Sequence, residues 1–163
     1  MKAASPVFIP EGPAVSKTDL NSVETSLGVQ LPPSYIAFVT TLGPGLWCGE
    51  AVKPPSALYA FDSDCEEMEG FIALVENVQG IGDHLAFDPA DPPVSGERPL
   101  YYCGHDPFGC ARTSDSFAAW TSESFQAFLA DESPYAAAEA VIAQTPSRAL
   151  RPGAKRWWQF WRK

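Results

Sequence analysis

The stretch 100–129 constrains the fold most, because two strand patterns separated by a turn pattern follow one another in it without a break. Residues 100–103 form a bulky apolar run typical of a buried strand, and residues 104–109 contain the Gly, Asp and Pro that favour turns. Residues 110–113 can return antiparallel to the first strand. The stretch therefore predicts a β-hairpin.

An amphipathic helix is predicted directly after this hairpin. Phe125, Phe128 and Leu129 have helical spacing. They follow Ser122, whose hydroxyl can accept hydrogen bonds from the free N–H groups at a helix start. We therefore expect a helix that begins at Ser122 and presses one aromatic stripe onto the sheet that contains the hairpin.

Two further helices are predicted near the N-terminus. Ser16 is suited to cap a helix that ends at Gly28, because glycine readily adopts the left-handed conformation of a helix end. Pro33 stands near the first position of a second apolar pattern over 31–42, where its missing N–H costs nothing. The two helices should pack closely, since only a short link joins them.

The other elements are less sharply marked. Residues 1–15 contain three prolines and are expected to form an extended arm whose apolar residues 7–9 contact the core. The proline-rich segment 88–99 predicts a surface loop, and residues 135–144 predict a short last helix after Ser133 and Pro134. The remaining apolar runs predict strands at 46–52, 58–61, 71–78 and 85–87.

These elements fit one α+β domain, in which a mixed or antiparallel sheet is packed by two N-terminal helices and a late amphipathic helix. A chain of 163 residues can bury a core without disulfides or metal. We place the domain at 1–145, including the arm, and a linker with a basic, Trp-rich tail at 146–163. Pro146, Pro152 and Gly153 mark this linker, so the tail should be dispensable for folding.

The N-terminal residues do not resemble a signal peptide, and no stretch reaches the roughly 20 apolar residues of a membrane-spanning helix. We therefore expect a cytoplasmic protein. In that compartment the four cysteines should be reduced, mostly buried thiols: Cys48, Cys65, Cys103 and Cys110.

Charge is distributed unevenly along the chain. Residues 1–147 contain 5 basic and 20 acidic residues, a formal charge of 5 − 20 = −15, whereas residues 148–163 contain 6 basic residues and no acidic ones. An acidic body repels nucleic acid and attracts basic proteins. The predicted partner-binding residues are the acids of 62–69 and of the proline-rich loop, namely Asp62, Asp64, Glu66, Glu67, Glu69, Asp88 and Asp91. The alternative for the first group is a solvated loop or an acidic helix start.

The tail carries aromatic side chains in a basic frame. Three tryptophans so close together are a liability in water unless something covers them. Three interpretations remain open: docking onto the acidic body, binding to a partner protein, or contact with an anionic membrane surface. The residues concerned are Trp157, Trp158, Phe160 and Trp161.

Nucleophile, base and carboxylate types come together in the sequence only around the hairpin turn. A Cys103–His105 pair would need spatial geometry that adjacency does not supply. A zinc site at Cys103, His105 and Cys110 lacks an evident fourth ligand. We therefore predict neither a catalytic site nor a metal or cofactor, and expect Asp106 and Pro107 to shape the turn while His105 caps or hydrogen-bonds backbone. His84 is expected to be a partly exposed structural residue.

The order of these motifs resembles that of the SUKH superfamily, named in part for a yeast regulator of cell-wall synthesis. The resemblance rests on a helix ending at Gly28, followed by LPPSYIAFV, GIGDHLAFDP, PLYYCGHDPFG and SFAAW, and it covers roughly 16–129. It implies a SUKH-like α+β fold. Many bacterial members are immunity proteins that neutralise secreted toxins, often nucleases or deaminases. The family has no common catalytic residues, so the resemblance implies no active site.

Three functional hypotheses follow. The first is a bacterial immunity protein that blocks a basic toxin, such as a nuclease, by occlusion without chemistry of its own. The second is a regulatory or scaffold protein that binds an endogenous partner and contacts the membrane through its tail. The third is an enzyme that uses Cys103 and His105.

Overall fold

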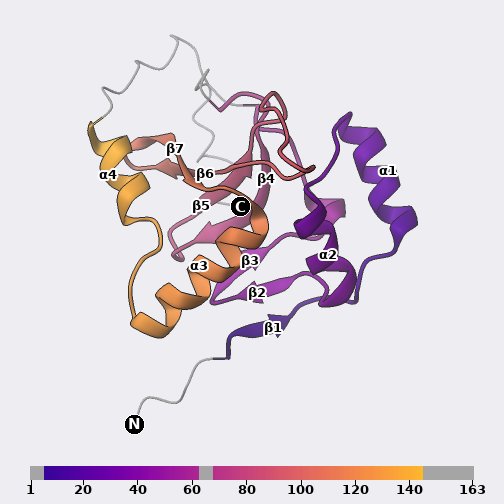
Figure 1. The fold of residues 1–163 in the computed structure, drawn as a ribbon, viewed down its shortest axis with the longest axis horizontal. Coiled ribbons are helices and arrows are strands. Elements are labelled where there is room, and N and C mark those ends of the chain that lie inside the picture. Colours follow the sequence, from indigo (N-terminus) through magenta and orange to yellow (C-terminus); the bar gives the residue numbers. More distant parts are fainter. Residues whose placement is uncertain (1–5, 63–67, 145–163) are drawn as a thin grey trace, which may run out of the picture.

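A computed structural model describes residues 6–62 and 68–144, which form a seven-stranded antiparallel sheet with helices packed against it (Figure 1). The strands are β1 (Phe8–Pro10), β2 (Gly45–Trp47), β3 (Glu50–Val52), β4 (Ile72–Val78), β5 (Asp83–Phe87), β6 (Leu100–His105) and β7 (Phe108–Ser114). The helices are α1 (Lys17–Leu27), α2 (Pro33–Thr41), α3 (Phe117–Ala130) and α4 (Ala136–Gln144), with a short 3-10 helix at Pro55–Ala57. This confirms the predicted α+β class.

The two N-terminal helices form as the sequence predicts. The Ser16 hydroxyl caps α1 by accepting a hydrogen bond from the Asp19 N–H, 3.2 Å away. Gly28 ends the same helix at φ 68°, a conformation that costs glycine little. Pro33 is the first residue of α2, as expected.

Each strand of the sheet pairs with the next one along the chain, so the order in space is β1-β2-β3-β4-β5-β6-β7. The predicted single strand at 46–52 is wrong: Cys48, at φ 51°, and Gly49, at φ 91°, turn the chain and split it into β2 and β3. The extended arm gains a strand that was not predicted, because Phe8 pairs with Trp47. The predicted strand at 58–61 is also wrong, since only an isolated bridge joins Ala60 to Ile72 there.

The helix after the hairpin begins earlier than predicted. Its cap is Ser116, whose hydroxyl accepts a hydrogen bond from the Ala119 N–H at 3.0 Å, and Ser122 lies inside the helix. Phe117 and Trp120, each 1% exposed, therefore anchor α3, while Leu129 is 64% exposed. The aromatic anchors of the helix therefore lie about two turns before the predicted stripe.

The last helix, α4, packs on β7 and β6 at the predicted place in the chain. Tyr135, just before it, is fully buried, and Ile142 lies against the tip of the β6–β7 hairpin. A Cβ added at Gly109 would lie 3.0 Å from Cγ2 of Ile142, so a larger residue there would push the helix away. Glycine in this strand therefore sets the close approach of α4 to the sheet.

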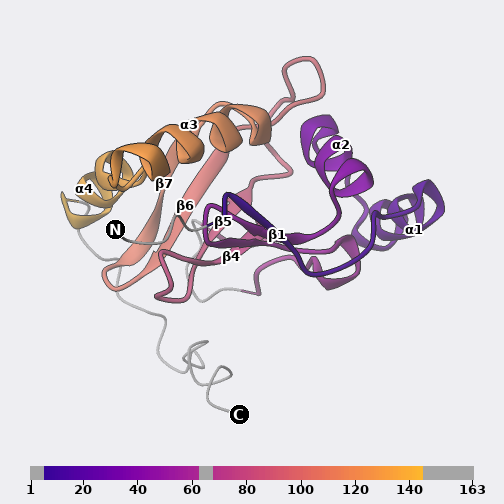
Figure 2. The same ribbon diagram turned by 90° about the horizontal axis from the view of Figure 1, so that it is seen from below.

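The two faces of the sheet are covered differently. The main core joins the helices to one face, and Figure 2 shows α3 and α4 along that side. A second, smaller cluster forms on the other face of β5–β7, and its described members include no helical residue: Met68, Phe71, Ala86 and Cys103, with Phe61, Tyr101, Phe108 and Cys110 packed against them. We call this side of β5–β7, with the described residues 58–62 and 68–71 beside it, the helix-free face.

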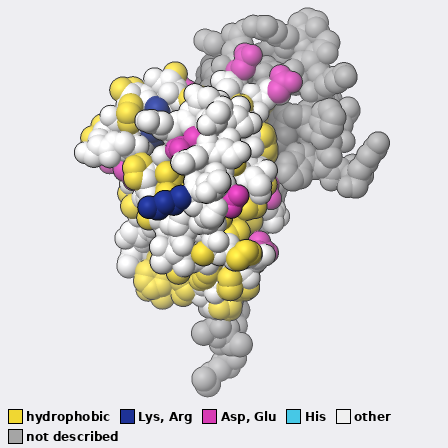
Figure 3. Space-filling view, turned by 90° about the vertical axis from the view of Figure 1, so that its right-hand side faces the viewer, with side chains coloured by type: hydrophobic (Ala, Val, Ile, Leu, Met, Phe, Trp, Pro, Cys, Tyr) yellow, Lys and Arg dark blue, Asp and Glu magenta, His cyan; other side chains and the backbone are white. Residues whose placement is uncertain are grey.

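Figure 3 shows a third side of the molecule, to the right in Figure 1. Hydrophobic side chains gather at its lower end, near the N-terminal arm, and its acidic side chains lie apart from one another. Ile9 on β1, 42% exposed, is one of the large hydrophobic residues on the surface of the protein. This side does not present a continuous acidic surface.

The observed start of α3 leads to a prediction about stability. Phe117→Ala should destabilise the protein by about 3–5 kcal/mol, because it leaves a cavity between α2 and α3. Leu129→Ala, in the residue expected from sequence to face the sheet, should cost at most about 0.5 kcal/mol. Urea unfolding of both variants measures the difference, and equal losses would contradict the observed orientation of α3.

Candidate partner-binding face

Tyr101 brings together the two acidic segments that the sequence marks as partner-binding. Its hydroxyl donates to Oδ2 of Asp91 in the proline-rich loop at 2.8 Å. Its ring also packs on Phe71, which follows the acidic cluster in the chain. The two ring centroids are 5.1 Å apart. The loop and the described end of the acidic segment, residues 68–71, therefore meet at Tyr101 on the helix-free face, although some twenty residues separate them in the chain.

The segment 58–71 is fixed to this face at its two ends. Phe61 N–H donates to the Phe71 carbonyl at 2.8 Å, and Gly70 N–H donates to the Phe61 carbonyl at 2.9 Å. Met68 is 3% exposed and packs into the second cluster. These contacts hold the ends of the acidic cluster beside the sheet.

The predicted acidic residues differ in their surroundings. Asp62 and Glu69 are exposed, whereas Asp88 and Asp91 are half-buried. Asp88 Oδ1 accepts a hydrogen bond from the Ala90 N–H at 2.8 Å, so it also shapes the loop. The other three predicted acids, Asp64, Glu66 and Glu67, lie outside the described residues.

The proline-rich loop is anchored at its base and ordered at its tip. Arg98 donates to the carbonyl of Pro89 at 2.9 Å, and Glu97 accepts hydrogen bonds from the N–H and the hydroxyl of Ser34, both at 2.7 Å. At the tip, Val94 and Glu97 exchange two backbone hydrogen bonds of 2.9 and 3.0 Å. Val94 is 78% exposed. The loop therefore presents an apolar tip in a preorganised conformation, which lowers the entropy cost of binding.

The electrostatics of the face are negative around Tyr101. Burial, the hydrogen bond and negative charge of Asp91, and the charge of Asp88 together raise the pKa of its hydroxyl to about 12, although the charge of Arg112 opposes the rise. Arg112 stands opposite on β7, but its guanidinium is paired with Asp115 at 2.7 Å. A basic partner would therefore meet uncompensated carboxylates here.

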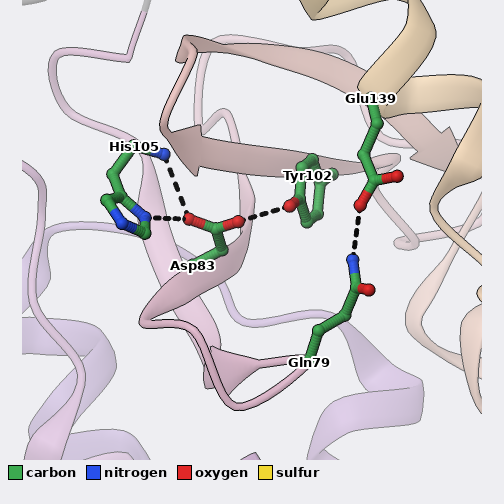
Figure 4. Close-up of polar contacts among 5 residues, drawn as sticks. All are labelled: Gln79, Asp83, Tyr102, His105 and Glu139. Carbon is green, nitrogen blue, oxygen red and sulfur yellow. Dashed lines mark hydrogen bonds and ion pairs between the residues drawn. The ribbon is translucent and has the colours of Figure 1, made fainter.

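The helix side of the sheet contains a buried polar network that the sequence does not predict. Asp83, 2% exposed, accepts hydrogen bonds from the Tyr102 hydroxyl and the His105 N–H, and Nδ1 of His105 lies 2.5 Å from its Oδ1 (Figure 4). Near it, Gln79 donates to Glu139 of α4 at 2.5 Å (Figure 4). A carboxylate next to glycine in a turn pattern reads as a surface residue, so only the tertiary contacts could reveal this role.

The same network adds a contact for one histidine and corrects the prediction for the other. Nδ1 of His105 faces the Asp83 carboxylate, a contact that the sequence did not predict. His84 is 2% exposed instead of partly exposed, and its Nε2 lies 3.2 Å from the Tyr59 hydroxyl. Burial and the nearby Lys53 charge lower the pKa of His84 to about 4. Asp106 does shape the turn, as expected, since it lies between β6 and β7.

The residues weighed for chemistry lie on the same strands without forming a recognisable centre. Cys103 is buried, and its Sγ lies 3.7 Å from the Tyr101 carbonyl. Among residues 6–62 and 68–144, no group of three or more His, Cys, Asp or Glu is placed to hold a metal ion. The His105 ring faces the Asp83 carboxylate, which orients it.

A second buried carboxylate, Glu50, connects the sheet to both late helices. It accepts a hydrogen bond from the Tyr135 hydroxyl, which in turn accepts one from Nε1 of Trp120 at 2.9 Å. Burial raises the pKa of Glu50 to about 7, although the hydrogen bonds from Tyr135 and from the backbone of Gln79 oppose that rise. Near neutral pH this carboxyl is therefore divided between its protonated and ionised forms.

The four aromatic residues of the tail, Trp157, Trp158, Phe160 and Trp161, lie outside the described residues, as does Cys65. Within the described part of the chain, no helix has the length and hydrophobicity needed to cross a bilayer.

The raised pKa of Glu50 predicts how stability depends on pH. The folded protein binds more protons here than the unfolded chain between pH 4.5 and about 7, so this group lowers stability as the pH rises through that window. Glu50→Gln should therefore gain about 1–3 kcal/mol relative to the wild type between pH 4.5 and 8. Urea unfolding at both pH values measures this change.

His84 acts in the opposite direction in the wild type, because the unfolded chain binds more protons than the folded one between about pH 4 and 6.5. The comparison of Glu50→Gln with wild type removes that contribution, since both proteins keep His84. Glu132→Gln, an exposed substitution of the same kind, is the matched control. A Glu50→Gln difference that does not change with pH would contradict the ionisation of this buried carboxyl.

Comparison with known proteins identifies a family. Residues 14–130 match the model of the SMI1 / KNR4 family (SUKH-1). The match begins just before α1 and ends with α3, so it includes the helix-free face. No curated protein and no solved structure matches the chain significantly.

Proposed function

The chain belongs to the SMI1/KNR4 family (SUKH-1), and from this membership we propose that it is a bacterial immunity protein that binds and neutralises a secreted toxin. Many members of the family are immunity proteins. The observation that carries the proposal further is the position of Tyr101, which joins two acidic segments into one surface. We propose this helix-free face as the toxin-binding surface.

The chemistry of the face favours a basic partner. A nuclease must hold phosphates in its active site and therefore presents positive charge there. Exposed carboxylates such as Asp62 and Glu69 would attract such a site over a distance of about 8 Å at physiological salt and accelerate encounter. Occlusion of the site by the acidic face would block the toxin without any reaction.

The proline-rich loop connects this face to the helical side of the molecule. Its base carries Asp88 and Asp91, while its tip, with the exposed Val94, is bonded to the start of α2 through Glu97 and Ser34. The acids at the base would set the rate of association.

Co-expression tests the function directly. The probe is the toxin domain of a secreted protein encoded beside this gene. The immunity proposal predicts that co-expression rescues cell growth from that toxin and not from an unrelated toxin. A regulatory or scaffold protein would rescue cells from neither, and that outcome would overturn the proposal.

The kinetics of binding test the surface. Asp62→Asn/Glu69→Gln should lower the association rate with this toxin domain by roughly threefold to tenfold and leave dissociation nearly unchanged. Raising the salt concentration should have a similar effect on the wild type. Surface plasmon resonance measures both rates.

A matched control removes the same charge elsewhere. Glu11 follows β1 at the opposite edge of the sheet, and Glu132 follows α3; both are exposed. Glu11→Gln/Glu132→Gln should leave the association rate within about twofold of wild type. If both double variants bind alike, the helix-free face is not where the toxin approaches.

A further inference from the structure

We propose that the basic aromatic tail, residues 154–163, binds the helix-free face of its own molecule, beside Tyr101 and Phe108. The tail and a toxin would use the same face, so a toxin would have to displace the tail, but the test of tail binding needs no toxin. It rests on where the described chain ends, on the charges of the face, and on its aromatic side chains.

The described chain ends close to this face. Ile142 lies against Gly104 and Gly109, so the last turn of α4 is at the tip of the β6–β7 hairpin. β7 is an edge strand, and only this edge separates the end of α4 from the other side of the sheet. Residues 145–153 can span up to about 30 Å, three times the usual 10 Å between packed layers. The tail can therefore reach the helix-free face.

The charges of tail and face are opposite. The segment 148–163 carries six basic and no acidic residues. The described acids on or beside the face are Asp62, Glu69, Asp88, Asp91 and Asp106.

The basic side chains of the face already have carboxylate or carbonyl partners. Lys53 is buried in an ion pair with Glu76 at 2.5 Å, and Arg112 is paired with Asp115. Arg98 donates to carbonyl groups within its own loop. The exposed acids are therefore not neutralised by the described basic residues, and the tail is the part of the chain with the charge to do so.

Aromatic side chains give the tail a place to pack. Tyr101 and Phe108 are half-buried on neighbouring strands, and Phe61 and Cys110 border them. Tryptophan and phenylalanine rings pack favourably on such rings in edge or offset arrangements. Basic residues on both sides of the tail's aromatic cluster would then lie above the surrounding carboxylates.

Charge and proximity favour this occupant over the alternatives. An anionic membrane that attracts the tail would repel a body with a formal charge of −15. A separate protein would compete with a segment held at an effective concentration of about millimolar by its short linker. Binding within the molecule avoids both costs.

Photo-crosslinking of the full-length protein tests the proposal. The photoreactive residue p-benzoylphenylalanine replaces Phe160, and mass spectrometry locates the crosslinks. We expect crosslinks within one molecule, to peptides that contain residues 101–112 or 68–71. Crosslinks to α1 or α3, or no crosslinks within the molecule, would overturn the proposal.

Charge reversal makes the test specific to the face. Asp62→Lys/Glu69→Lys should reduce the crosslink yield by roughly threefold to tenfold, whereas Glu11→Lys/Glu132→Lys should change it less than about twofold. Circular dichroism checks that both variants fold. If either variant does not fold, the protein with an unaltered face is crosslinked in 0.5 M NaCl instead. Salt should lower the crosslink yield to a similar degree, and an unchanged yield would count against electrostatic docking.

The other occupants give different results. Crosslinks between two molecules would show that the tail binds a second copy. Co-sedimentation of the full-length protein with vesicles containing 30% phosphatidylserine, but not with phosphatidylcholine vesicles, would show a membrane site. Either result would overturn docking within the molecule, while leaving the toxin co-expression experiment unaffected.

Discussion

The buried hydroxyl of Tyr135 is the contact on which the helical side of the fold depends. It donates to Glu50 at the start of β3 and accepts from Trp120 of α3, while its ring stacks on Tyr102 of β6 at 5.1 Å. One side chain thus joins both late helices to two distant strands. Removing either hydrogen-bonding partner would leave a buried polar group unsatisfied, which costs more than the bond itself contributes.

The second face is held together by different means. No helix of the described chain covers β5–β7 there. Tyr101 instead connects the proline-rich loop, through Asp91, to the segment that follows the acidic cluster, through Phe71. The segments that this residue joins carry the acids by which we propose that a toxin is recognised. Recognition would then depend on Tyr101 in strand β6, which positions the surface segments without itself needing contact with the partner.

The sequence was sufficient where a local rule decides the structure. Ser16 and Gly28 delimit α1 because capping and left-handed backbone are properties of single residues. It failed where two local signals compete: both Ser116 and Ser122 can cap a helix, and only burial of Phe117 selects the first. The acidic surface was predicted as two separate segments, since their meeting at Tyr101 depends on strand pairing. The roles of buried charges such as Asp83 arise wholly from tertiary contacts.

The strict neighbour-to-neighbour order of the strands has a consequence for biosynthesis. Five of the six strand pairings join strands made shortly after one another, so the sheet can extend as the chain leaves the ribosome. The exception is β1, because Phe8 must wait for Trp47 to be synthesised after both N-terminal helices. Loop closure over that distance is the slowest pairing by contact-order reasoning. The first strand to be translated therefore joins the sheet only after α1 and α2 have been synthesised. Until then, the edge of β2 that β1 covers in the folded protein remains open.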